Sequence, residues 1–186
     1  MKKFFSLVVF FTVFFLNIGA VELNKFKIDA EKNASLHNNQ GVNCLKERYY
    51  YGAIKEFEMA IQLNPNTQAT AVYYDNLGRT YVIIGYPNKA QICFERAVIQ
   101  NPLNFDYYLS LVSVYKKRGL LDFKLREYKL KKDNPLNKIM VGLLYIEKGE
   151  VSTGITVLDN FCHDEPDLLI TKAVRAYIKQ KAIKKK

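Results

Sequence analysis

Apolar residues recur with helical spacing in the segment from Tyr50 to Pro65. The positions concerned, three and four residues apart, are Ala53, Ile54, Phe57, Ala60 and Ile61. This spacing places them along one stripe of an α-helix. A proline disfavours helical conformation in the residue before it, so we expect this helix to end just before Pro65.

The same pattern returns farther along the chain. An offset of 37 residues (90 minus 53) relates Ala53 to Ala90, Phe57 to Phe94, Ala60 to Ala97, and Pro65 to Pro102. A second helical stretch precedes each copy and contains a glycine, Gly41 or Gly78, where a side chain would separate two packed helices. Each unit is therefore predicted to be a helical hairpin. A short hairpin cannot bury both faces alone, so we expect the hairpins to stack.

These residues resemble the tetratricopeptide repeat family. The second unit carries nearly the whole pattern of that family: Tyr74, Leu77, Gly78, Tyr81, Gly85, Ala90, Phe94, Ala97 and Pro102. The first unit keeps Gly41, Ala53, Phe57, Ala60 and Pro65, with His37, Gln40 and Cys44 at positions that are usually aromatic, leucine and tyrosine. The resemblance implies an all-α solenoid of stacked hairpins, whose first helices line a concave groove for an extended peptide or a partner helix.

The repeat domain is predicted to span residues 34–166, after a lead-in segment at 21–33. Its units are placed at about 34–67, 71–104, 105–134 and 135–166. The third unit is degenerate, because Lys124, Tyr128 and Lys131 stand where the pattern is small, aromatic and small. The fourth unit is also degenerate and begins early.

Residues 167–186 are predicted to form a capping helix with a basic tail. The apolar stripe consists of Leu169, Ile170, Ala173, Val174, Tyr177 and Ile178. A terminal helix with a polar outer face is what a solenoid requires at its end. A helix that lies on a membrane surface is the alternative for this segment.

The first twenty residues are typical of a signal peptide. Lys2 and Lys3 precede an apolar run from Phe4 to Leu16, and small residues follow at Gly19 and Ala20. The alternative is a retained membrane anchor, but a helix of this length reaches only ~20 Å, whereas the hydrocarbon core measures ~30 Å. We expect an exported protein, secreted or periplasmic, in a bacterial envelope.

The positive charge is concentrated in the second half of the chain. Residues 21–104 contain 9 basic and 8 acidic residues (+1), and residues 105–186 contain 17 and 10 (+7). Solvated helix faces explain such a balance, but an anionic membrane or cell-wall polymer could also bind there, through residues 116–132 and the lysine-rich tail. Nucleic acid is not expected, because export would keep the protein away from it.

No pattern in the sequence indicates catalysis, a cofactor or a metal. The two histidines, His37 and His163, are too few for a histidine cluster, and no glycine-rich phosphate loop is present. The run from Cys162 to Glu165 is interpreted as a hydrated turn, because four adjacent residues cannot all converge on one ion. The three cysteines are expected to be buried free thiols, although export leaves a disulfide possible.

Candidate partner-binding residues lie on the helix sides opposite the packed stripes: Asn38, Asp75, Asn76, Arg79, Asp106 and Ser113. The resemblance implies that Asn76 matches an asparagine that helps bind a terminal carboxylate in some members. Asn38, Val42, Asp106 and Ser110 replace the rest of that site, so such a carboxylate clamp is not expected. A solvated face is the alternative. The sequence thus predicts a non-enzymatic scaffold or adaptor for a protein or peptide partner whose identity it does not reveal.

The signal peptide leads to a first prediction. The processed protein should begin near Val21 and fractionate outside the cytoplasm, because the small residues before that position suit cleavage. Intact-mass analysis of fractionated cells measures this directly. Recovery of the chain from membranes with Met1 still attached would identify a membrane anchor instead.

Overall fold

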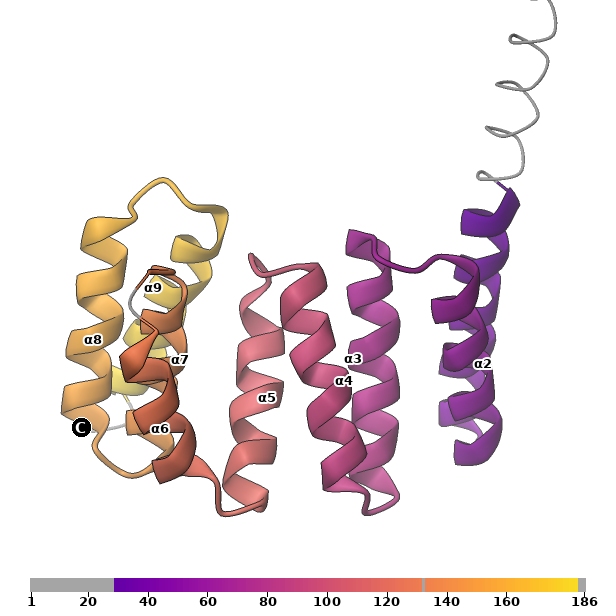
Figure 1. Ribbon diagram of the computed structural model, residues 1–186, viewed down its shortest axis with the longest axis horizontal. Coiled ribbons are helices and arrows are strands. Elements are labelled where there is room, and N and C mark those ends of the chain that lie inside the picture. Colours follow the sequence, from indigo (N-terminus) through magenta and orange to yellow (C-terminus); the bar gives the residue numbers. More distant parts are fainter. Residues whose placement is uncertain (1–28, 132, 184–186) are drawn as a thin grey trace, which may run out of the picture.

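The computed structural model describes residues 29–131 and 133–183, and all regular secondary structure in these ranges is helical. The predicted signal peptide lies outside the described residues. The helices span residues 29–46, then α2 (Tyr50–Leu63), α3 (Gln68–Ile83), α4 (Pro87–Gln100), α5 (Phe105–Lys117), α6 (Leu121–Leu130), α7 (Asn137–Glu147), α8 (Val151–Asp164) and α9 (Leu169–Ile183). From α2 to α5 they follow one another along the molecule, and α6 to α9 gather at its other end (Figure 1). The predicted all-α class of stacked hairpins is confirmed.

Two hairpins close tightly through a glycine on the first helix and an aromatic ring on the second. A Cβ atom on Gly41 would lie 2.5 Å from the ring of Phe57, and one on Gly78 would lie 2.7 Å from the ring of Phe94. A Cβ atom does not pack this close to another atom, so a side chain at either position would push the ring away. Both rings are buried, as are the small residues that flank them: Ala53, Ala60, Ala90 and Ala97.

The other repeat-pattern positions divide between the core and the surface. Leu77 and Tyr81 are buried, and Tyr74 is half-buried. Pro65 and Pro102 are exposed in the loops that follow α2 and α4. Their contribution is therefore to end the helices and not to fill the core.

Glycines also form the tight turns inside the hairpins. Gly85, Gly119 and Gly149 follow α3, α5 and α7 with φ angles of 82°, 67° and 94°. Side chains disfavour this left-handed region, which glycine enters without a steric penalty. Arg48 takes the same conformation, with a φ of 61°, in the turn before α2.

Residues 68–70 form the first turn of α3. Thr67 is the N-cap, and its hydroxyl accepts a hydrogen bond from the Thr70 backbone N–H over 3.3 Å. The Thr67 backbone N–H in turn donates to Thr70 Oγ1 over 3.0 Å. This reciprocal capping satisfies two backbone N–H groups that have no partner within the helix. It stabilises the start of α3 at Gln68, three residues after Pro65.

The third hairpin is open. Val112 on α5 is equivalent to Gly78 in the second hairpin (112 minus 78 is 34). By the same offset, Lys124 on α6 is equivalent to Ala90 on α4. These larger side chains prevent the close approach seen in the first two hairpins. Consequently α6 packs mainly on α7, whereas α4 packs on α3 and α8 packs on α7. Leu125 is the one buried residue of α6.

The end of the solenoid is closed by α9. This helix packs on α8 and also reaches α5, where the Phe105 and Tyr177 rings meet edge to face with their centroids 5.3 Å apart. Ile170 and Val174 are buried in the same core. The predicted capping helix is therefore confirmed. Within residues 29–131 and 133–183, no helix has the combination of length and apolar character needed to cross a membrane.

The contrast between closed and open hairpins leads to a stability prediction. Phe94→Ala should lower the free energy of unfolding by ~3 to 5 kcal/mol, because it leaves a cavity in a tight hairpin. Tyr128→Ala, the equivalent change on α6, should cost less, because α6 does not pack closely on α5. Chemical denaturation of both variants measures the difference. Equal losses would contradict the distinction between the two hairpins.

Candidate functional site

The first helices of successive hairpins are joined by a polar contact between two of the predicted groove residues. Asn76, on α3, donates from Nδ2 to Oδ1 of Asn38, in the helix at residues 29–46, over 2.9 Å. Both side chains are half-buried. The contact pairs one amide donor with one amide acceptor and leaves the remaining amide groups available to a partner.

Arg79 is the best-oriented charged group among the predicted groove residues. Its Nε donates to Asp75 Oδ2 over 2.6 Å, and one terminal nitrogen lies 3.4 Å from Ser110 Oγ on α5. The Arg79 side chain is 53% exposed, whereas Asp75 as a residue is only 7% exposed. Asp75 therefore lies behind the guanidinium and orients it, and does not itself face solvent.

The second carboxylate oxygen of Asp75, Oδ1, is buried and accepts no hydrogen bond among the described residues. The Tyr107 side chain on α5 is also buried. Burial raises the pKa of the Tyr107 hydroxyl, and the nearby Asp75 charge raises it further. Tyr107 therefore stays protonated at neutral pH, and the charged side chains that act on it are Asp75, Asp106 and Arg79.

Asp106 and Ser113 are exposed on α5, and among the described residues neither side chain forms a hydrogen bond or ion pair with Arg79. The Asp106 backbone N–H donates to the side chain of Asn104, the N-cap of α5. The structure thus brings together Asn38 with Asn76, and Arg79 with Asp75. The sequence places Ser110 at a position of the carboxylate site of the family but does not predict its contact with Arg79, because that contact depends on the spacing of α3 and α5.

Some of the described lysines in the basic half pair with carboxylates of other elements. Lys138 lies 2.6 Å from Asp164, Lys116 lies 3.0 Å from Glu147, and Lys148 lies 2.7 Å from Asp122. Hydrogen bonding to Lys148 lowers the pKa of the Asp122 carboxyl, so this partner is charged at neutral pH. These pairs fix the positions of three lysines and leave the balance of +7 unchanged, because the carboxylates are already counted in it.

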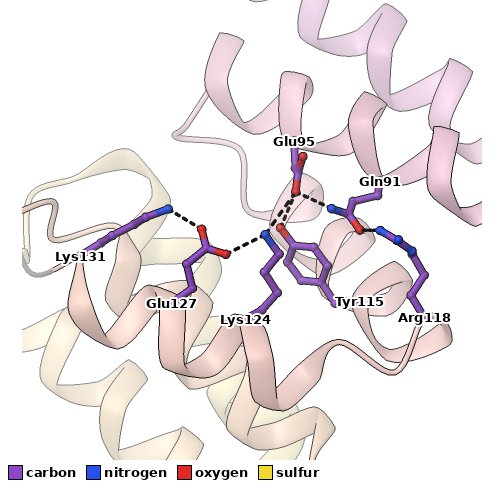
Figure 2. A network of polar contacts seen from close by, with 7 residues as sticks. All are labelled: Gln91, Glu95, Tyr115, Arg118, Lys124, Glu127 and Lys131. Carbon is purple, nitrogen blue, oxygen red and sulfur yellow. Dashed lines mark hydrogen bonds and ion pairs between the residues drawn. The ribbon is translucent and has the colours of Figure 1, made fainter.

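Four charged groups in α4, α6 and the residue after α6 form one network (Figure 2). Lys124 Nζ lies 2.9 Å from Glu127 and 3.7 Å from Glu95, and Lys131 also binds Glu127. Hydrogen bonds from Lys131 and Lys124 lower the pKa of Glu127. The buried Tyr115 hydroxyl donates to Glu95 over 2.9 Å. The network holds α6 against α4 where direct packing is loose.

The cysteines are free and separate. Burial, followed by the nearby Glu58 charge, raises the pKa of the Cys93 thiol to about 12. Burial also raises the pKa of Cys162. His163 and Asp164 are exposed, and Asp164 pairs with Lys138. No group of three potential metal ligands occurs among the residues that the structure describes.

These observations define an all-helical solenoid whose first helices carry polar side chains in contact with one another. Residues 71–102 match the family model of the tetratricopeptide repeat. The chain therefore contains a tetratricopeptide repeat, and the resemblance noted from its sequence is confirmed. Repeats of this kind form surfaces for protein–protein interaction, and the architecture is that of an interaction scaffold.

Several solved structures are similar to the chain. The TPR domain of OM64 from Arabidopsis shares 15% identity and aligns over 81% of this chain and 98% of that one, with a TM-score of 0.45. PilF from Pseudomonas aeruginosa shares 18% identity over 78% and 67% of the two chains, with a TM-score of 0.49. YrrB, a TPR protein described as having an unusual peptide-binding site, shares 19% identity over 87% of each chain, with a TM-score of 0.45. No curated protein matches the chain.

The thiol environments lead to a labelling prediction. In the folded protein at pH 8, iodoacetamide should modify the half-buried Cys44 faster than Cys93, because a pKa of about 12 leaves almost none of Cys93 as the reactive thiolate. Peptide mass spectrometry over time gives both rates. In denaturant the two rates should converge, and equal rates in the native state would contradict the assigned burial.

Proposed function

We propose that this protein is a non-enzymatic scaffold that binds a protein or peptide partner in the groove formed by the helix at residues 29–46, α3 and α5. The observation that carries the proposal is the Arg79 guanidinium, half exposed and held by the buried Asp75 carboxylate and by Ser110. An exported location in a bacterial envelope is part of the proposal and is supported by the pattern of the first twenty residues.

An arginine held in this way favours binding. Its side chain is already partly ordered, so less conformational entropy is lost when a partner binds it. The planar guanidinium presents several donors that can bind a main-chain carbonyl or a carboxylate of the partner. Asn76 adds an amide to the same surface, so both donors and acceptors of a peptide chain can be matched there.

Binding to an anionic membrane or cell-wall polymer is the alternative. It is supported by the +7 balance of residues 105–186 and by Lys129, which is exposed on α6 with its Nζ 4.7 Å from the Tyr145 ring centroid. In this alternative Lys116, Lys138 and Lys148 would meet the surface with carboxylates beside them, and the balance of +7 already counts these carboxylates.

Photo-crosslinking tests the groove. Benzoylphenylalanine at exposed position 113 should crosslink a defined envelope protein, and Arg79→Ala or Asn76→Ala should each reduce the yield severalfold. The matched control is Arg96→Ala, which removes an exposed arginine from α4, the second helix of the same hairpin. Arg79→Ala leaves the buried Asp75 carboxylate without its partner, which could destabilise the fold. The double variant Asp75→Asn with Arg79→Gln removes both charges, so a loss of crosslinking in it reports on binding and not on stability.

Salt and vesicles distinguish the alternative. Groove capture should persist in moderate salt, whereas attraction to an anionic surface should be screened. Removal of residues 184–186 should change groove capture little. The proposed scaffold function would be contradicted by one pattern of results. In that pattern the protein binds anionic vesicles, salt and Lys129→Ala each abolish this binding, and Arg79→Ala and Asn76→Ala leave it unchanged.

A further inference from the structure

A cavity of about 550 Å³ lies between α4, α5, α6 and α7. It is distinct from the groove, because none of Asn38, Asn76 and Arg79 lines it. Volumes of this size are typical of sites for small molecules. One buried side chain would fill only part of it.

The cavity results from the open third hairpin. In the second hairpin, the small Ala90 and Ala97 allow α4 to approach α3 closely. In the third, Lys124 and Lys131 occupy the equivalent positions (124 minus 90 is 34) and line the cavity instead. The space that a closed hairpin would remove is therefore retained.

The lining has an apolar part, which comes from three helices, and a polar part that includes Asn134 and Asn137. Val98 belongs to α4, Leu111 to α5 and Met140 to α7, and all three line the cavity. Leu111 and Met140 are buried core residues. The Tyr108 hydroxyl, also at the cavity, already donates to the Pro102 carbonyl over 2.9 Å. The apolar part favours contact with hydrocarbon or aromatic carbon.

The charged groups of the cavity lining are already paired with one another. Lys124 is shared between Glu95 and Glu127, and Glu127 also binds Lys131 (Figure 2). A charged ligand would have to disrupt these contacts or enter an apolar space without a counter-ion, and both are costly. A neutral ligand leaves the network intact.

We propose that this cavity binds a small, neutral, apolar molecule. The site requires nothing of the groove or of its protein partner. Ile99, which lines the cavity and is exposed on α4, provides an apolar entrance. Binding would fill the space that the open hairpin leaves and would join α4 to α6 and α7 through apolar contact.

Methyl NMR of the full chain tests this site with toluene as the probe. Met140 lines the cavity, and Met59, on α2, serves as a control within the same molecule. Toluene should shift the Met140 methyl resonance in a saturable way and leave Met59 unchanged. Benzoate and benzylamine, which match toluene in shape but carry a charge, should bind at least about tenfold more weakly, because charge is excluded from apolar space.

Two cavity-filling variants complete the test. Val98→Phe should weaken toluene binding at least about tenfold by occupying the space. If Val98→Phe loses its native methyl spectrum, Ile99→Trp, at an exposed position, replaces it with the same expectation. The proposal is overturned if toluene does not shift Met140, if it shifts Met59 equally, if the charged analogues bind as well, or if a folded cavity-filling variant binds toluene unchanged.

Discussion

The structure depends on how closely the two helices of each hairpin approach one another. In the second hairpin, the absence of a side chain at Gly78 lets the Phe94 ring lie against the backbone of α3. That contact sets the distance between α3 and α4, and the stacking of hairpins then sets the position of α5. Arg79 on α3 reaches Ser110 on α5 because of this spacing. A contact in the core thereby determines the geometry of a surface.

The third hairpin has lost this contact, and its helices separate. Val112 and Lys124 add side chains at positions that are small in the second hairpin, so α6 turns to α7. The Lys124 side chain is only 14% exposed, and a cation at that depth needs counter-charges. Glu95 and Glu127 provide them. The ion network and the cavity are thus two consequences of the same departure from the repeat pattern.

The sequence predicts this fold well where the information is local or periodic. The constant offset between Ala53 and Ala90 identifies repeated hairpins, and the stripe from Leu169 identifies the last helix. It does not predict that α9 reaches Phe105 on α5, because that contact depends on the angle between distant hairpins. The burial of Asp75 was missed for a similar reason. Helical spacing places a residue on a face but does not say how deeply the neighbouring helix covers it.

Net charge is a poor guide to specific binding in this protein, because it does not say how each cation is oriented. The second half of the chain has the larger excess of lysine and arginine, yet Lys116, Lys138 and Lys148 each bind a carboxylate of another element or turn. The first half is almost neutral, yet Arg79 is held outward by an acid that lies beneath it. A single oriented guanidinium next to an amide discriminates between partners by geometry, whereas a diffuse positive field attracts any anion and is weakened by salt. For this reason the groove, and not the more basic half, is the better candidate for specific recognition.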